Sequence, residues 1–385
     1  MASSAGFDER MEFADVRVGP IELALDGPLF GSLFRGGPVW PDFERQVLAR
    51  HCRGAVPRPV DDRPRRETPE ARKVYPRAVW CGPVVGHFGH MIADFGMRIA
   101  AAAHFEPDAH FLFSGRPEDW PGLLRPPRVF YDLLQVWGLP LERVRVLRQP
   151  AHARSLVVYP QAERLGGGAP SEAYLDFLQK VAGPVRPLAG KDIDTLYVSR
   201  AGFLRGGLAG ESYLEEAMAG LGAVVLRPET LGVSAQLELY GRARRLVFCE
   251  GSAIHTLQLL GRLDAEVVVI CRRPGERLAE ASLLPRCRSV TYVDALAGLV
   301  FGLRPTGWPP QPSKGIGVLQ EKRFLERMAQ AGLDLRRGWS SLDYRRRRDL
   351  DLEAWRTASA ALRPPGAMES KLVSGLEGLA RLRGR

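Results

Sequence analysis

The chain has 385 residues, of which 45% are hydrophobic and 25% charged, a balance typical of globular proteins and unlike that of a disordered chain. No apolar run approaches the roughly 20 residues that cross a bilayer, and we expect no signal peptide, because no basic and apolar regions follow the first residue. The five scattered cysteines lack a Cys-x-x-Cys spacing, which indicates a reducing, cytoplasmic compartment and no zinc ribbon. The length favours two domains.

The net charge of +10 arises from 54 basic and 44 acidic residues. Such an excess attracts polyanions, an acidic membrane surface or a phosphate-bearing substrate. Arginine, glycine and proline are all abundant, and we favour a compositional bias of the coding genome as the source of the excess. The charge alone therefore assigns no partner.

In the first half, residues 1–70 are rich in glycine and proline and are expected to form an irregular N-terminal segment. Strands are then predicted at 74–81, 110–113, 144–147 and 155–159, with helices at 90–104, 129–137 and 172–181. The alternation of strands and helices favours a parallel sheet, which gives an N-terminal α/β domain over residues 71–185.

The second half is more regular. Strands are predicted at 195–199, 223–227, 245–249, 266–271 and 289–293, with helices at 211–221, 234–242 and 253–260. This pattern predicts a doubly wound, Rossmann-like domain over residues 190–302. Residues 303–385 begin with several prolines and are expected to form a helical C-terminal extension, with helices at 318–331, 349–362 and 369–382.

The first segment that carries chemistry is 86–98. On a helix, His90, Asp94 and Arg98 share one face because they are four residues apart. A histidine beside a carboxylate is a workable general base, but the same three groups also suit a buried polar network that locks the helix. His87 and His90 are spaced for a metal, yet no third ligand is evident nearby, so we expect no metal site.

The second segment follows the strand at 195–199, where Arg200 ends the strand and Arg205 lies in a glycine-rich loop. Glu211 opens the next helix. Guanidinium groups beside a helix N-terminus suit a pyrophosphate. An ion pair between Arg200 and Glu211 is an equally good interpretation. No Gly-x-Gly-x-x-Gly or Walker sequence occurs, so no dinucleotide or ATP cradle of those types is expected.

The third segment runs from the strand at 245–249 into a turn of small residues and a helix. Gly251 and Ser252 allow a ligand to approach the backbone, while Glu250 and His255 either bind donor hydroxyls or brace the turn. The acidic pair of Asp192 and Asp194 has the Asp-x-Asp form of metal-dependent sugar transferases, but it precedes its strand and is interpreted as solvated linker.

Together these segments resemble glycosyltransferase family 61, which includes bacterial capsular-polysaccharide enzymes and plant xylosyl- and arabinosyltransferases. The resemblance covers about residues 74–294 and depends on the order and spacing of motifs. The matching positions are His90, Asp94, Arg98, Ser199, Arg200, Arg205, Glu211, Pro228, Glu229, Gln236, Gly251, Ser252 and Ala253. Glu250 stands where the family usually has histidine, and His255 and Thr256 stand where it has threonine and asparagine.

The resemblance implies a GT-B architecture, with two facing Rossmann-like domains, the donor in the second and the acceptor largely in the first. It also implies inverting, metal-independent sugar transfer from a nucleotide-sugar to a glycan or lipid-linked glycan, without a cofactor, in surface polysaccharide synthesis. His90 or Asp94 would be the base, and Arg200 and Arg205 would hold the diphosphate. Glu250, Gly251, Ser252 and His255 would border the donor, with Arg98, Glu211 and Gln236 in support.

Two other functions compete with this one. The altered turn at 250–256 would suit a non-catalytic assembly partner with the same fold. The net charge and the arginine run 345–348 would suit a nucleic-acid-binding protein, but acids flank the run and no aromatic RNA motif is present. The helix predicted at 369–382 carries a leucine face that would suit peripheral contact with the inner membrane face, although packing on the protein is the interpretation we favour.

Overall fold

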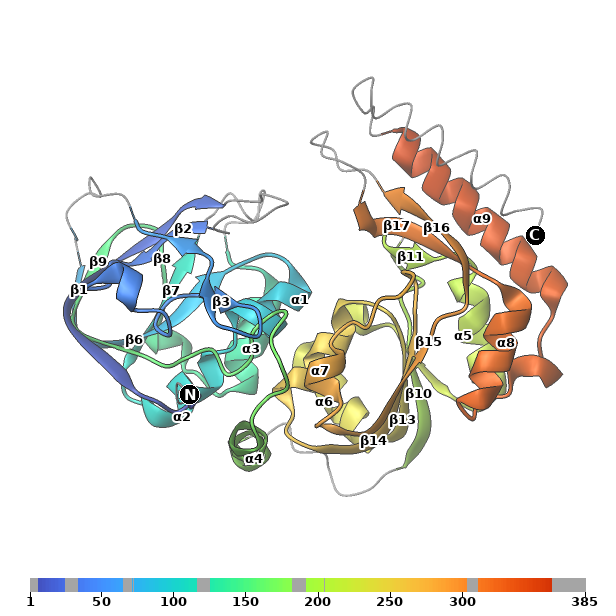
Figure 1. Ribbon diagram of the computed structural model, residues 1–385, viewed down its shortest axis with the longest axis horizontal. Helices are drawn as coiled ribbons and strands as arrows, with labels where there is room; N and C mark the ends of the chain where they lie inside the picture. Colours follow the sequence, from blue (N-terminus) through green and yellow to red (C-terminus); the bar gives the residue numbers. More distant parts are fainter. Residues whose placement is uncertain are drawn as a thin grey trace.

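The computed structural model describes residues 6–24, 34–64, 71, 73–115, 125–181, 192–203, 205–302 and 311–361. Two sheets lie side by side, one in the N-terminal half (residues 6–181) and one in the C-terminal half (residues 192–361) (Figure 1). Among these residues no helix combines the length and apolar character required to cross a bilayer.

The N-terminal sheet has seven strands in the order β5-β2-β1-β9-β6-β7-β8. Its four strands β9, β6, β7 and β8 are parallel, whereas β1 pairs antiparallel with β9 and with β2. The strands of this half are β1 (Met11–Ala24), β2 (Phe34–Pro38), β3 (Cys52–Arg53), β4 (Arg58–Pro59), β5 (Asp61–Asp62), β6 (Lys73–Val84), β7 (His110–Gly115), β8 (Val144–Leu147) and β9 (Ala151–Val158). The strands β3 and β4 form a separate small ribbon.

The expectation that residues 1–70 are irregular is wrong for β1 and β2, which extend the sheet beyond its parallel part. In β1, Val16 and Val18 are buried and Arg17 between them is more exposed, which is the alternation of a strand with one face on the core. Asp15 interrupts this alternation because it has a left-handed backbone (φ 53°). The partner strand β9 lies far along the chain, so local periodicity could not indicate the pairing.

The helix predicted at 90–104 is broken into three parts, α1 (Phe88–His90), the π-helical turn η2 (Met91–Phe95) and α2 (Ile99–Phe105). The wide turn depends on Gly96, where a Cβ would lie only 2.5 Å from the carbonyl oxygen of Met91. The other helices of this half are η1 (Phe43–Arg45), α3 (Arg128–Val136), η4 (Leu141–Arg143) and α4 (Glu172–Val181).

The C-terminal sheet is entirely parallel, with the order β12-β10-β13-β14-β15. These strands are β10 (Ile193–Val198), β12 (Val224–Leu226), β13 (Ala243–Cys249), β14 (Leu263–Ile270) and β15 (Cys287–Val293). The connections reverse direction between β10 and β13, and in open α/β sheets a ligand binds at the carboxyl ends of the strands at such a point. Arg200 follows β10 there, and Glu250 follows β13.

The helices of this half are α5 (Glu211–Gly220), η6 (Pro228–Thr230), α6 (Val233–Arg242), the 3₁₀ helix η7 (Ser252–Leu259), α7 (Glu280–Leu283), α8 (Glu321–Gln330), η8 (Leu335–Arg337) and α9 (Ser341–Ala360). In Figure 1, α6 and α7 lie on the side of the sheet that faces the N-terminal half, and α5 and α8 lie on the other side.

The prediction that the C-terminal extension is helical is incomplete, because the extension also contains a strand. This strand, β17 (Gln311–Leu319), pairs with β16 (Leu296–Gly302) and with β11 (Gly207–Leu208) in a third sheet. Of the prolines expected near the start of this extension, Pro312 lies in β17, and Pro305, Pro309 and Pro310 lie outside the described residues. Of the arginine run, the first three residues are on the exposed side of α9, where Arg345 and Arg347 pair with Glu321 and Glu216, and Arg348 is buried. The helix predicted at 369–382 lies outside the described residues.

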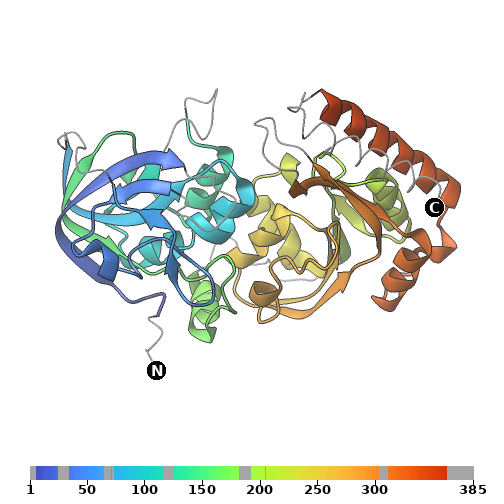
Figure 2. The ribbon, with the colours of Figure 1, turned by 45° about the horizontal axis from the view of Figure 1, so that its top comes forward.

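The two halves share apolar core. One buried cluster runs from Phe113 and Phe130 in the N-terminal half to Ile254, Leu257 and Phe248 in the C-terminal half, and α3 contacts α6 across the junction. Helix α4 lies at this junction in both views (Figures 1 and 2). Continuous apolar packing therefore fixes how the two sheets face each other.

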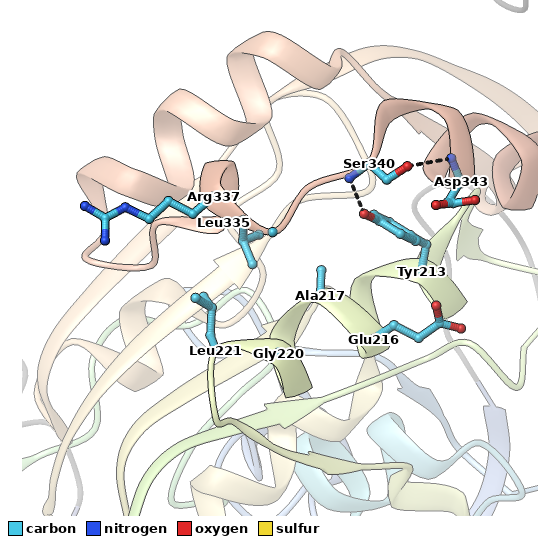
Figure 3. A pocket seen from close by; sticks show the side chains of 10 residues that line it. Tyr213, Glu216, Ala217, Gly220, Leu221, Leu335, Arg337, Ser340 and Asp343 are labelled. Atoms are coloured by element: carbon cyan, nitrogen blue, oxygen red, sulfur yellow. Dashed lines mark hydrogen bonds between the residues drawn. The ribbon is translucent and has the colours of Figure 1, made fainter.

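A pocket of about 490 Å³ lies elsewhere, between α5 and the chain around η8 (Figure 3). Ala217, Leu221 and Leu335 line its apolar part, and the Tyr213 hydroxyl accepts a hydrogen bond from the Ser340 main-chain N–H at its edge. None of the predicted site residues lines it.

A glycine inside β6 gives a first prediction. Gly82 has φ +114°, and a Cβ there would lie 2.8 Å from the carbonyl oxygen of Phe95, so Gly82→Ala should lower the free energy of unfolding by about 2–4 kcal/mol. Urea unfolding would measure this. Gly138→Ala adds a Cβ at positive φ without a clash and isolates the backbone term, and Gly168→Ala has neither penalty. Equal stability of the Gly82 and Gly168 variants would contradict the close approach.

Candidate active site

Asp94 is the centre of the N-terminal part of the site, and its side chain is completely buried. Its Oδ1 lies 3.0 Å from His51 Nε2, and Arg53 donates to its Oδ2 from Nε at 2.9 Å and from Nη2 at 2.5 Å. Burial alone would raise the pKa of Asp94, but His51, His90 and Arg53 outweigh it and hold the pKa well below its ordinary value. Asp94 is therefore a permanently charged, fully engaged carboxylate.

His90 is the most exposed member of this cluster, with 40% of its side chain exposed. Its Nδ1 lies 3.8 Å from Asp94 Oδ2, as the spacing of four residues predicted. The carboxylate can therefore orient the ring, and the exposed part of the side chain is accessible to a ligand.

Arg98 does not join His90 and Asp94 on one helix face. Its Nε donates to the Tyr159 carbonyl oxygen at 2.7 Å, and its Nη2 donates to the carbonyl oxygen of Arg50 at 2.6 Å and to those of Leu48 and Ala49. The turn at η2 rotates it away from the exposed face. It is a buried support for the chain that leads to His51, and burial lowers its pKa to about 10.

Sequence reasoning missed His51 and Arg53, because they lie in the stretch that was taken as irregular. Gln161 was missed as well: its Oε1 accepts the Cys52 N–H at 2.6 Å, and its Nε2 donates to the Asp94 carbonyl oxygen at 3.2 Å. The available signal was a histidine and an arginine that flank the apolar Cys52, but nothing local connects them to Asp94.

In the C-terminal half, Arg200 follows β10. Its main-chain N–H donates to Glu211 Oε1 at 2.5 Å, and its Nε donates to the Gly206 carbonyl oxygen at 3.3 Å. The guanidinium lies over Gly251, where a Cβ would be 2.3 Å from Nη1. Glu211 thus holds the main chain of Arg200 rather than pairing with its guanidinium, and burial raises the pKa of Glu211.

Arg205 and Lys314 lie beside this loop. Arg205 is exposed and forms no hydrogen bond or ion pair with the residues that the structure describes. The N–H of Gly206 donates to the Gly315 carbonyl oxygen at 3.0 Å, so β17 places Lys314 next to the loop. Gln236 is further away: it is buried, and its Nε2 donates to the Pro228 carbonyl oxygen at 2.8 Å, which supports the loop after β12.

Glu250 braces the turn, which is one of the two roles predicted for it. It is buried, and its Oε2 accepts main-chain N–H groups of Arg272 and Arg273 at 3.0 and 3.2 Å, while its Oε1 accepts Arg273 Nε at 2.5 Å. These bonds are those of a brace, the alternative interpretation of Glu250, and a contact between its carboxylate and a donor hydroxyl stays a prediction. The residues that it braces, Arg272 and Arg273, were missed.

The two halves meet at Gly89. A Cβ there would lie 2.9 Å from the Ser252 Cβ and 3.1 Å from the His255 Cδ2. His255 Nδ1 lies 2.7 Å from Gln258 Oε1, which only accepts, so Nδ1 carries the proton and Nε2 is the acceptor of the neutral ring. Gln258 in turn donates to Glu163 Oε2 at 3.0 Å, and Glu163 forms a buried ion pair with Arg286. Helix η7 is therefore fastened to the N-terminal half through Glu163.

Titratable and basic groups from both halves lie near His87. Although the His87 side chain is exposed, desolvation by the surrounding protein lowers its pKa to about 4, and the nearby His90, Lys314, His255 and Arg200 act in the same direction. His87 and His90 come from the N-terminal half, and the other three groups come from the C-terminal half. The first, second and third sequence segments are thus close enough to share one ligand.

Asp192 and Asp194 lie at the amino end of β10, opposite the edge with Arg200, where they pair with Arg242 and Arg244. Within the described residues no group of three or more histidine, cysteine or acidic side chains is arranged to hold a metal ion.

Residues 88–262 match the model of the family Glycosyltransferase 61. The chain is a glycosyltransferase. No curated protein matches the chain. The match supports assignment to family 61 for a segment that contains His90, Asp94 and Arg200 together with the turn at Gly251.

The matched segment does not contain the whole cluster of this glycosyltransferase. His51 and Arg53 precede it, and Arg272, Arg273 and Lys314 follow it. The groups that neutralise Asp94 and those that surround Arg200 are therefore supplied in part by regions outside the family segment.

The lowered pKa of His87 predicts a pH effect on the stability of this glycosyltransferase. Between about pH 4 and the ordinary value of 6.5 the unfolded chain binds a proton that the folded ring refuses, so stability should rise with pH across this window. His87→Asn keeps an acceptor for the His90 N–H but removes the titration, and the rise should become smaller. Urea midpoints at about pH 5 and about pH 7 would test this. Parallel pH profiles for both proteins would contradict it.

Proposed function

We propose that the enzyme is an inverting, metal-independent glycosyltransferase that transfers a sugar from a nucleotide-sugar to a glycan acceptor in surface polysaccharide synthesis. In this proposal the halves form a GT-B arrangement, with an acceptor domain up to residue 185 that includes β1 and β2, and a donor domain over 190–302. The observation that carries the proposal is the contact at Gly89, which joins the His90 cluster to the Arg200 loop.

The donor side is proposed from topology and charge. Arg200 and Gly251 lie at the carboxyl edge of the C-terminal sheet, on either side of the reversal between β10 and β13. An arginine fork suits phosphate oxygens, and Gly251 allows close approach because it has no Cβ. Arg205 adds an exposed cation at the same loop. These features support a nucleoside diphosphate as the part of the donor that is held here.

The acceptor side is proposed from the contrast between Asp94 and His90. Asp94 is buried and bound by His51 and Arg53, so it cannot reach an acceptor hydroxyl. His90 is partly exposed and lies against that carboxylate. We therefore assign His90 as the general base and Asp94 as the residue that positions it and stabilises its protonated form.

The proposed step is a single displacement at the anomeric carbon. His90 accepts the proton of the acceptor hydroxyl as that oxygen bonds to the anomeric carbon from the face opposite the leaving group. The bond from this carbon to the diphosphate oxygen breaks, and its electron pair leaves with the diphosphate. Attack from the opposite face inverts the configuration. Arg200 and Arg205 offset the developing negative charge, which is the task that a metal ion performs in other transferases.

The well-formed turn at Glu250 does not favour the alternative of a non-catalytic partner. Three groups of Arg272 and Arg273 satisfy the Glu250 carboxylate, so the departure from the family pattern produces a braced turn rather than a degraded one.

The donor is testable by thermal shift with UDP, GDP, CMP and their sugars, with and without EDTA. One nucleotide should raise the apparent melting temperature, because a ligand of the native state stabilises it by mass action. The shift should survive EDTA and disappear in Arg200→Ala. Arg288→Gln, which removes a surface arginine paired with Asp264, is the matched control and should keep the shift. Absence of any shift would contradict the donor assignment, and loss with EDTA would contradict metal independence.

The base is testable with the donor so identified. His90→Gln should slow release of nucleoside diphosphate by about 100- to 10,000-fold while nucleotide affinity and melting temperature stay near wild type, since general-base catalysis contributes in this range. Asp94→Asn should instead lower the free energy of unfolding by about 3–5 kcal/mol, because it leaves His51 and Arg53 without a buried anion.

Turnover by His90→Gln equal to wild type would rule out the base assignment. The anomeric configuration of the product, read by NMR, gives the independent test of inversion, and a retained configuration would contradict the single displacement.

A further inference from the structure

Arg272 is a second guanidinium beside Arg200, and the site described so far does not use it. It follows β14 and is only 6% exposed. Its Nε donates to the Glu250 carbonyl oxygen at 2.9 Å, and its main-chain N–H donates to Glu250 Oε2 at 3.0 Å. Its Nη1 is buried and finds no hydrogen-bond partner in the part of the chain that the structure describes.

Gly206 shows how close the two guanidinium groups lie. A Cβ built there would be 3.5 Å from Arg272 Nη1 and 3.7 Å from Arg200 Nη2. The guanidinium groups of Arg272 and Arg200 thus both lie next to the loop at Gly206. Within the described residues neither group forms an ion pair with a carboxylate, and the nearby acid, Glu250, has its ion pair with Arg273.

Such a pair is unfavourable without an anion. Burying a cation removes its hydration, and a second positive charge nearby adds repulsion. Both effects are visible at Arg272, where burial, together with the charges of Arg200 and Arg273, lowers the pKa to about 10 despite the opposing effect of Glu250. A buried donor without a partner and an adjacent cation are what a bound anion would satisfy.

We propose that Arg272 and Arg200 form a two-guanidinium clamp for the diphosphate of the donor, with Arg272 as its fixed, buried member. The proposal rests on the proposed function and adds a binding residue from outside the segment that matches the family. Each planar guanidinium donates two N–H groups in a fork that suits phosphate oxygens. Together the two charges match those of a diphosphate group.

Glu250 is the positioning residue of this clamp. Its carboxylate fixes the main chain of Arg272, and its carbonyl oxygen fixes the Nε, so the guanidinium is already in place before the anion arrives. A preorganised cation loses little entropy on binding, which strengthens each charge-assisted hydrogen bond. The departure of position 250 from the residue expected there thus has a purpose in this chain.

The experiment is isothermal titration calorimetry of the full chain with inorganic pyrophosphate and with UDP and GDP. Arg272→Gln should bind pyrophosphate about 10- to 100-fold more weakly than wild type, since hydrogen bonds between charged groups contribute in this range. Arg272→Lys keeps the charge but not the fork and should fall between the two. Arg288→Gln should bind as wild type does.

A folding readout separates binding from structure. Without anion, the melting temperature of Arg272→Gln should stay near that of wild type, because the substitution removes an unsatisfied buried donor and a repulsive charge along with one hydrogen bond. The rise in melting temperature that pyrophosphate gives wild type should be lost. If Arg272→Gln does not fold, the pyrophosphate affinity of Arg272→Lys is the test. If Arg272→Lys binds pyrophosphate as tightly as wild type does, with the same salt dependence, the clamp is overturned.

The outcomes distinguish the two proposals. If Arg200→Ala loses pyrophosphate binding and Arg272→Gln binds as wild type, the clamp is overturned and the donor site stands. If both variants bind pyrophosphate and nucleotides as wild type does, both proposals fall. Loss of affinity in both variants, with Arg288→Gln unaffected, supports the clamp.

Discussion

The buried charge of Asp94 is the constraint on which the N-terminal half depends. An isolated carboxylate inside a protein is strongly unfavourable, so the chain must bring cations to it. Arg53 supplies a cation, His51 lies within hydrogen-bond distance of the carboxylate, and Arg98 holds the main chain that leads to them. The segment that contains His51 and Arg53 therefore packs against η2. His90 lies beside the Asp94 carboxylate, which these residues already bind.

Gly89 is the point where the segment that carries His90 and Asp94 packs against the C-terminal half. A residue with a Cβ at this point would push α1 away from Ser252 and His255, so the contact depends on the absence of a side chain. The apolar cluster shared by α3, α6 and η7 holds the halves against each other, and the hydrogen bond from Gln258 to Glu163 fastens η7 to the N-terminal half. Both kinds of contact involve η7, and η7 begins at Ser252 in the proposed donor site. The packing between the halves therefore also sets the position of Ser252.

Much of this architecture could be predicted, because strands of the parallel sheets carry strong local signals. The C-terminal sheet matches the predicted strands within a few residues, since each is a short apolar run between glycine or proline signals. The failures have physical causes. Asp15 breaks the alternation of β1, Gly96 permits a π-helical turn where spacing alone predicts one helix, and His51 reaches Asp94 across a separation of 43 residues. Pairings of that range leave no periodic trace in the sequence.

The location of charge is more informative than its total. On the surface, arginines are neutralised by acids, as in the pairs of Arg242 with Asp192, Arg262 with Asp176 and Arg336 with Asp334. A polyanion would need a broad unpaired surface, and exposed pairs of this kind weaken it. By contrast, Arg200 and Arg272 lie together without a carboxylate partner in the described residues and are confined between the loop and the edge of the sheet. A small site with concentrated positive charge suits a compact anion, which supports the proposed diphosphate, whereas the total excess of basic residues assigns no partner.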